Sequence, residues 1–171
     1  MNMKVQVINK SNNQLPKYET SGAAGMDIRA SFKNVSPENP IRLFGDGEII
    51  FKGDNHQLTM LRLEPGSRAI VPTDLYLAVP KGNFCAIYPR SGLAIKKGLS
   101  LVNSVGVLDE DYRGMLGVPV INEGLETIWI EDGERIAQII FQPYSKVELE
   151  EVESLDVTDR NPTGFGSTGT K

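Results

Sequence analysis

The sequence predicts an all-β domain, built as a sandwich or a barrel. Short runs rich in Val, Ile, Leu, Tyr and Phe recur along the 171 residues, and Gly, Pro, Asn and Asp separate them. Apolar and polar residues alternate within several runs, so that Leu75, Leu77 and Val79 share one face of a strand. No segment sustains the apolar stripe of a long helix. We therefore expect many short strands and little helix.

The predicted strands follow one another through most of the chain. In order they are residues 4–8, 26–30, 68–72, 75–80, 83–89, 99–102, 116–121, 127–130 and 136–141. Each run is short, and each is bounded by residues that favour turns. The one exception to this pattern is Ser91–Gly98, where Ser91 can cap a helix, Lys96 and Lys97 suit its last turn, and Gly98 can end it. We expect one or two helical turns there.

The same pattern predicts the domain organisation. Residues 1–159 are expected to form a single β domain, with a β hairpin inserted at about residues 33–60. After Pro143 the sequence becomes acidic, and we expect an edge strand in that segment. Residues 160–171 are rich in glycine and are expected to form a mobile C-terminal arm.

Composition excludes several partners. With 40% hydrophobic and 23% charged residues, the chain can build one domain with a core. A formal net charge of −4 and the lack of a Lys/Arg run argue against binding a long nucleic acid. Neither a signal peptide nor an apolar stretch of about 18 residues is found, so we expect a cytoplasmic protein without a membrane span.

Several catalytic classes are excluded because the chain lacks their residues. His56 is the only histidine, so a Ser-His-Asp or Cys-His mechanism lacks a base and the usual His/Cys zinc sites lack ligands. Cys85 lies in an apolar run and is expected to be buried and unreactive. The end of the chain is not a P-loop, because Thr170 stands where that motif requires Lys.

Two segments could nevertheless bind phosphate. Pro89–Gly92 places an arginine, a hydroxyl and amide donors at the start of the predicted helix, although these residues could equally serve only as its cap. Gly164–Lys171 could fold its amides over phosphate oxygens beside Arg160, or it could be a plain flexible tail.

A third segment, residues 106–114, is acidic and contains a tyrosine. A hairpin turn would explain its polarity. Its carboxylates could also activate water or organise a metal, and Tyr112 could lie against a sugar or a base. Together with the two phosphate-binding candidates, this segment suits a nucleotide.

Five segments in order resemble the five motifs of the trimeric dUTPases. They are AAGMDIRA (23–30), PRSGLAIKKG (89–98), NSVGVLDEDYRGMLGV (103–118), GERIAQIIF (133–141) and RNPTGFGSTG (160–169). The resemblance implies a jelly-roll-like β sandwich, a homotrimer with shared active sites, and hydrolysis of dUTP to dUMP and pyrophosphate. It also implies Mg²⁺ as cofactor, held through the triphosphate and waters with no direct protein ligand.

The resemblance assigns catalytic roles to two aspartates. Asp109 matches the family's water-activating carboxylate, and Asp27 matches an aspartate that supports the catalytic centre through waters and a neighbouring arginine. Tyr112 resembles the tyrosine that packs beneath the deoxyribose and excludes a 2′-hydroxyl. Glu110 and Asp111 receive no substrate contact, so we expect them to be solvated or to lie at a subunit contact.

The other matched positions are implied to bind substrate. The uracil pocket is expected to be lined by Asn103 and the backbone around Gly106, Val107, Leu108 and Gly117. The phosphates are expected to be contacted by Arg90, Ser91, Gly92 and Gln138, with Arg135 as a structural ion-pair partner. The arm is expected to contribute Arg160 to the γ-phosphate, Phe165 to the uracil face, and Gly166, Ser167 and Thr168 to a turn that covers the phosphates.

Two features depart from the family's pattern. Asn161–Thr163 replaces the usual glycine-rich stretch, and Pro162 is expected to stiffen the arm. Residues 33–60 are the second departure. Two alternatives stay open: a dCTP deaminase of the same fold, and a nucleotide-sensing regulator that binds a protein partner through residues 33–60.

Overall fold

The computed structural model describes residues 3–52 and 57–158, which form twelve strands and one short helix. The elements are β1 (Gln6–Asn9), β2 (Met26–Arg29), β3 (Arg42–Phe44), β4 (Gly47–Lys52), β5 (Gln57–Leu63), β6 (Arg68–Ala78), β7 (Asn83–Pro89), α1 (Ser91–Lys97), β8 (Leu99–Leu101), β9 (Gly106–Leu108), β10 (Met115–Asn122), β11 (Ile128–Glu131) and β12 (Arg135–Pro143). The prediction of an all-β chain with one short helix is confirmed.

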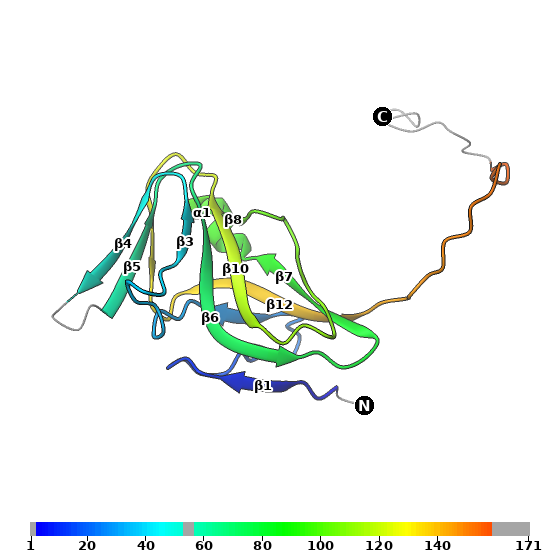
Figure 1. Ribbon diagram of the computed structural model, residues 1–171, viewed down its shortest axis with the longest axis horizontal. Coiled ribbons are helices and arrows are strands. Elements are labelled where there is room, and N and C mark those ends of the chain that lie inside the picture. The colour runs from blue at the N-terminus through cyan, green and yellow to red at the C-terminus, as the bar shows by residue number, and fades with distance from the viewer. Residues whose placement is uncertain (1–2, 53–56, 159–171) are drawn as a thin grey trace.

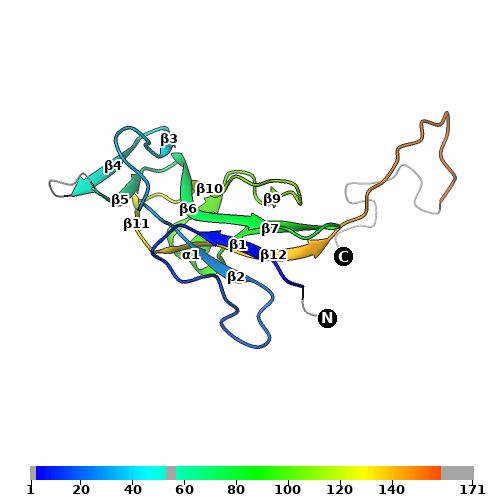
Figure 2. The same ribbon diagram turned by 60° about the horizontal axis from the view of Figure 1, so that its bottom comes forward.

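The strands form three antiparallel sheets (Figures 1 and 2). The largest has the order β1-β6-β10-β8, and β3 also pairs with β6. The second has the order β2-β12-β7-β9, and the third the order β11-β5-β4. Both views place β4 and β5 at one end of the body, beyond the two larger sheets. The sandwich of sheets predicted from the sequence is therefore present.

Alternation along the strands produces the core. In β10, Leu116, Val118 and Val120 are at most 1% exposed, while the residues between them are half-buried. Ile28 of β2 and Ile139 of β12 are buried to the same extent and belong to the same hydrophobic cluster. Because burying each such side chain contributes about 1.5–3 kcal/mol, this cluster holds the sheets together and fixes the faces of their strands.

Two runs predicted as separate strands are one long strand, β6. The break between them was expected at Thr73 and Asp74, and Asp74 does have a left-handed backbone conformation (φ 55°). Its buried carboxylate accepts hydrogen bonds from Ser31 Oγ (2.6 Å) and Asn34 Nδ2 (3.0 Å). Non-glycine residues adopt this backbone conformation uncommonly, and the two hydrogen bonds stabilise it at Asp74. Strand β6 therefore bends at Asp74 without ending. Opposite the bend, the register with β10 shifts between Met115 and Gly117.

The segment of about residues 33–60 contains three strands. The predicted β hairpin is confirmed, because β4 and β5 pair antiparallel, whereas β3 was not predicted. β3 pairs with β6, and β5 pairs with β11, while Val35 and Ile41 are buried in the core. That this segment is an insertion stays a prediction.

The helix prediction is correct in position and wrong in its cap. α1 ends at Gly98, whose φ of 73° suits the left-handed conformation that glycine favours. Its N-cap is Arg90 rather than Ser91, and no side chain caps it, because an N-cap must accept from backbone N–H groups and a guanidinium group has only donors. Within the described ranges, no helix has the length and apolar character needed to cross a bilayer.

The edge strand expected after Pro143 is absent from residues 144–158. These residues run away from the body as an extended chain (Figure 1). Val147 is 77% exposed and Leu149 is 92% exposed. A strand needs a neighbouring strand to complete its ladder, and no described strand pairs with this segment.

Asn122 connects the third sheet to the largest one, and its removal should destabilise the fold. Its buried amide donates to Leu63 O (2.9 Å) and Glu126 O (2.8 Å) and accepts from Gly124 N (2.9 Å). We expect Asn122→Ala to lower the free energy of unfolding by about 2–4 kcal/mol, since buried backbone groups lose their partners. Denaturant unfolding at equal chain concentration measures this, and exposed Glu123→Ala is the control. An equal loss in both variants would contradict the prediction.

Candidate active site

Three of the predicted site residues, Asp27, Arg90 and Gln138, converge on the second sheet together with Arg135. β12 lies between β2 and β7, and its register sets Gln138 beside Asp27 on one side and beside Tyr88 on the other. Asp27 Oδ1 accepts from Arg90 Nε at 2.9 Å, and Asp27 Oδ2 accepts from Arg135 Nη1 at 3.2 Å. A single carboxylate thus holds two guanidinium groups that come from the ends of different strands.

This ion-pair cluster orients Arg90. The Arg90 side chain is 27% exposed and Asp27 is 18% exposed, so the pair is partly shielded from water. Arg90 Nη1 also donates to Arg135 O at 3.2 Å, which fixes the plane of the guanidinium group. An arginine has five N–H donors in a planar fork, so others remain for an anion. The expectation that Arg135 is an ion-pair partner is confirmed, although its side chain is 40% exposed.

The neighbouring phosphate-binding candidates lie beside this cluster. Ser91 and Gly92 are the first residues of α1, and both are exposed. A Cβ built on Gly92 would meet no atom within 4 Å, so the backbone there is open to an incoming group. Gln138 Nε2 donates to Pro89 O at 3.0 Å, directly before Arg90. These residues form a polar surface at the end of β7.

The acidic segment, residues 106–114, forms a second group of site residues. It is not the turn of a hairpin, because β9 pairs with β7 whereas β10 pairs with β6 and β8 in the largest sheet. β9 ends at Leu108, which is buried, and Asp109 follows it exposed to solvent. In the described part of the chain, the Asp109 carboxylate has no hydrogen bond or ion pair. Tyr112 N donates to Asp109 O at 3.3 Å and closes the turn. Asp109 therefore projects from a tight turn with its carboxylate free.

Tyr112 is held in one orientation within this acidic segment. Its hydroxyl donates to Met115 O at 3.1 Å. A Cβ built on Gly114 would lie 2.3 Å from that hydroxyl oxygen, so only glycine leaves room for the ring. A cavity of about 460 Å³ borders Tyr112, Met115 and Gly117. The ring thus forms one wall of a space that a sugar or base could enter.

Most of the predicted uracil-binding residues lie in β9 or shortly before it, whereas Gly117 lies in β10. Gly106 is buried, and a Cβ there would come 3.1 Å from Ile87 and 3.4 Å from Asn103 Nδ2. Leu108 points its side chain into the core, whereas Val107 is 61% exposed. The backbone of these residues is therefore the part that a ligand could contact.

Glu110 differs from its expectation. It was predicted to be solvated or at a subunit contact, but its side chain is 18% exposed and is bound within the chain. The carboxylate accepts a hydrogen bond from Gly82 N and lies 3.4 Å from Lys146 Nζ. The Gly82 N–H is the main cause that lowers the pKa of Glu110. Nothing in the sequence relates Glu110 to Gly82 or Lys146, because only the tertiary structure brings them together.

The two groups lie at opposite ends of β7. β9 pairs with β7 so that Leu108 faces Cys85, which sets Asp109 beside Phe84. Arg90 follows the last residue of the same strand. Phe84 and Arg90 are six residue steps apart along the strand, which corresponds to about 20 Å. One chain therefore does not bring Asp109 and Arg90 together.

Some predictions lie outside the described residues or concern other chemistry. Arg160, Phe165, Gly166, Ser167, Thr168 and His56 fall in the ranges that the structure does not describe. The prediction of an inert thiol is confirmed, because Cys85 is fully buried and burial raises its pKa to about 12. Within the described ranges, no three His, Cys, Asp or Glu side chains cluster to hold a metal ion.

Comparison with known proteins gives one family. Residues 56–169 match the family model of dUTPase. The chain is 44% identical to deoxyuridine 5'-triphosphate nucleotidohydrolase of Finegoldia magna, over 98% of this chain and 99% of that protein. It is 41% identical to the protein of the same name from Fusobacterium nucleatum, over 98% and 97% of the two chains.

Solved structures agree with these relatives. The dUTPase of Staphylococcus bacteriophage 80alpha, solved with dUpNHpp, is similar with a TM-score of 0.75 and 25% identity, over 97% of this chain and 98% of that one. The dUTPase of phage phi11, with a TM-score of 0.66 and 22% identity, covers 89% of this chain and shares its fold; a mutant of it was solved with a structural Mg(II) ion.

Proposed function

The chain belongs to the dUTPase family and hydrolyses dUTP to dUMP, and on that premise we propose that Asp109 activates the attacking water. Two aspartates were assigned catalytic roles, Asp109 as the base and Asp27 as a support, and their environments differ. Asp27 is bound by two guanidinium groups, which stabilise its charge and occupy its oxygens. The exposed Asp109 carboxylate is free to accept a proton. This contrast between the two carboxylates is the observation that carries the assignment.

The chemistry follows from the products. Since dUMP keeps the α-phosphate, the oxygen of water bonds to the α-phosphorus, the bond to the α–β bridging oxygen breaks, and pyrophosphate leaves. Asp109 would take a proton from the water as it attacks. Negative charge develops on the bridging oxygen, where the Ser91 hydroxyl and the amides at Ser91 and Gly92 would donate hydrogen bonds.

The Asp27 cluster would organise the phosphate side of the site. Arg90, oriented by Asp27 and by Arg135 O, would contact the phosphates with its remaining N–H groups. Gln138 lies on the neighbouring strand and would add an amide contact. Asp27 thus supports catalysis through Arg90, without touching the reacting water in this proposal.

We infer that the acidic segment, residues 106–114, and its neighbours hold the deoxyuridine. Asn103 and the backbone around Gly106, Val107, Leu108 and Gly117 would contact uracil, and the Tyr112 ring would pack against the deoxyribose. The hydrogen bond from Tyr112 to Met115 O supports this role, because a fixed ring can exclude a 2′-hydroxyl by steric contact. The arm residues Arg160, Phe165, Gly166, Ser167 and Thr168 are proposed to cover the phosphates and the base.

The active site is proposed to be shared between subunits of a homotrimer. Asp109 and Ser91 must act on the same phosphorus, yet the strand geometry separates them by about 20 Å within one chain. A second subunit that presents its Arg90 and Ser91 to the acidic segment of the first would bring these residues to the same phosphorus as Asp109. Residues 144–158, which run away from the body, would carry the arm towards a neighbouring subunit.

Mg²⁺ is proposed as the cofactor. It favours oxygen ligands, keeps several waters and binds through substrate phosphates with few carboxylates. When bound, Mg²⁺ would neutralise charge on the phosphates.

The two alternatives receive no support. The family model and the curated relatives are dUTPases, which does not favour a dCTP deaminase. A partner protein that binds residues 33–60 stays a prediction.

Asp109→Asn tests the assignment of the base. We expect the variant to bind dUpNHpp normally and to lose most turnover, since an amide keeps the shape of the carboxylate and cannot accept the proton. A fall of about 10²–10⁴ in kcat is expected for loss of a general base. Pyrophosphate release and calorimetric binding measure the two quantities. Near-normal kcat would refute the role of Asp109.

Tyr112 is tested by the ratio of UTP to dUTP hydrolysis. Tyr112→Ala should raise this ratio, and Gly114→Ala should raise it as well, because the added Cβ displaces the ring. Tyr112→Phe removes only the hydroxyl and should change the ratio least. An unchanged ratio in both Tyr112→Ala and Gly114→Ala would exclude steric selection by the ring.

Mixed trimers test the shared site. Asp109→Asn and Arg90→Ala chains should each be nearly inactive alone, and unfolding and refolding them together should restore activity. In an equimolar random mixture, roughly a quarter of the sites would combine an intact Asp109 from one subunit with an intact Arg90 from its neighbour. If both residues acted within one chain, every site would keep a defect and mixing would restore nothing.

A further inference from the structure

The turn that carries Asp109 is connected to two distant parts of the chain. Arg113 Nη1 donates to Glu110 O and to Tyr112 O, both at 2.8 Å, and these bonds close the turn on itself. The Glu110 side chain leaves the turn and reaches the loop before β7 and the segment after β12. The residue next to Asp109 is thus an anchor point for the whole turn.

The anchor joins three segments. Gly82 N donates to the Glu110 carboxylate, and Tyr144 N donates to Gly82 O at 3.2 Å. Lys146 Nζ lies 3.4 Å from the Glu110 carboxylate and 5.8 Å from the centre of the Tyr144 ring. The Tyr144 ring packs edge-to-face on Phe84, with 6.5 Å between ring centres. Phe84 is the residue that lies beside Asp109 in the register of β7 and β9.

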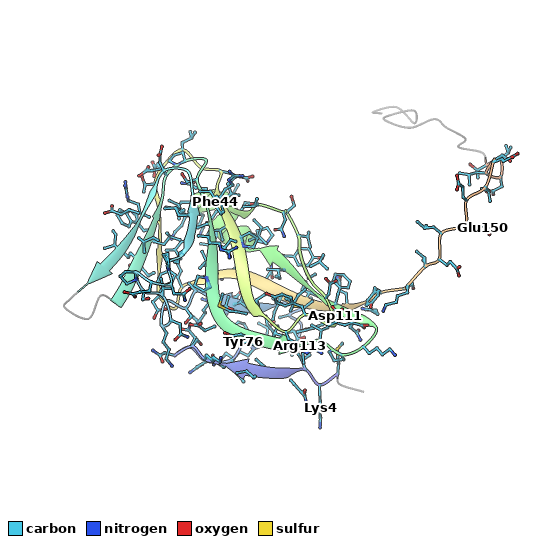
Figure 3. The ribbon with its side chains drawn as sticks, in the orientation of Figure 1. Lys4, Phe44, Tyr76, Asp111, Arg113 and Glu150 are labelled. Atoms are coloured by element: carbon cyan, nitrogen blue, oxygen red, sulfur yellow. The ribbon has the colours of Figure 1, made fainter. Side chains whose placement is uncertain are left out.

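These residues surround Asp109 itself. A cavity of about 510 Å³ is lined by Phe84, Val107, Asp109, Glu110, Asp111, Tyr144 and Lys146. Figure 3 shows Asp111 near the point where residues 144–158 leave the body, with Glu150 farther along that segment. Consecutive carboxylates at 109–111 repel one another, and Lys146 is the cation that faces them in this cavity. The contacts of Glu110 therefore oppose a displacement of the turn.

We propose that Glu110 is a positioning residue for dUTP hydrolysis: its carboxylate holds the turn that carries Asp109 against Gly82 and against Lys146 at the start of the C-terminal segment. This inference rests on the proposed role of Asp109. A displacement of a catalytic group by about 1 Å can cost as much as 10²-fold in rate, so an anchor one residue away acts on kcat.

The ionisation of Glu110 suits this role. The Gly82 N–H lowers the pKa of Glu110, and Lys146 lowers it further. A carboxylate with a lowered pKa contributes its contacts above its usual range and loses them only as pH falls through the lowered value. The anchor is therefore complete at neutral pH.

Three variants separate the contacts of Glu110. Glu110→Ala removes both contacts, Glu110→Gln keeps an acceptor for Gly82, and Lys146→Met removes only the charge partner. We expect Glu110→Ala to lower kcat for dUTP by about 10- to 100-fold, with KM changed by less than about threefold. The other two should lose less. Glu150→Gln removes an exposed charge on the same C-terminal segment and is the control with unchanged activity.

Hydrogen exchange of the Gly82 amide reads the anchor directly. In Glu110→Ala this amide should exchange at least about tenfold faster, since it loses its acceptor. The double variant Glu110→Ala/Lys146→Met should be no slower in turnover than Glu110→Ala, because both residues act through one contact. Wild-type kcat in Glu110→Ala, or a lower kcat with unchanged Gly82 exchange, would overturn the proposal.

The design separates this inference from the assignment of the base. Loss of turnover in Asp109→Asn with wild-type kcat in Glu110→Ala removes only the positioning role. Near-normal turnover in Asp109→Asn refutes the base itself, whatever the exchange of Gly82. If Glu110→Ala fails to assemble, wild-type kcat in both Glu110→Gln and Lys146→Met overturns the proposal.

Discussion

Strand β7 pairs with β12 on one side and with β9 on the other, and this double pairing places the Asp27 cluster and Asp109. Its last residue precedes Arg90, so the β12 side gathers the phosphate-binding cluster around Asp27. Its first residues lie beside the end of β9, so the other end holds Asp109. Because a strand is a stiff spacer, the two groups are kept apart within one chain.

The protein uses two carboxylates in opposite ways. Asp27 lies in a strand, is partly shielded from water and binds Arg90 and Arg135, so its carboxylate orients these two guanidinium groups. Asp109 lies in an exposed turn with no partner in the described part of the chain. The same side chain therefore supports substrate binding in one environment and proton transfer in the other. Backbone placement decides the difference.

The turn at Asp109 needs support from outside itself because it is short and acidic. Its internal bonds come from Arg113, and its external ones from Glu110 to Gly82 and Lys146. One of these external contacts is made by Lys146, which follows the end of β12 at Pro143, where the C-terminal segment begins. Segment and turn thus meet at one place, although they belong to separate parts of the sequence.

The sequence alone determined the fold class and most strands, because alternation and turn residues are local signals that burial enforces. It also determined the family, since five ordered motifs survive in the chain, and the inert Cys85, since its run is apolar throughout. The short strands β3 and β9 were missed because their pairing partners, rather than their own residues, hold them extended.

Tertiary structure alone decided how the site residues are grouped. The continuity of β6 through Asp74 depends on hydrogen bonds from Ser31 and Asn34, which no local pattern announces. No described strand pairs with the segment after Pro143, where an edge strand was expected. The length of β7 separates Asp109 from Arg90 within one chain. Glu110 found its partners 28 and 36 residues away. Contacts at such separations are set by how sheets pack, and a linear sequence does not display them.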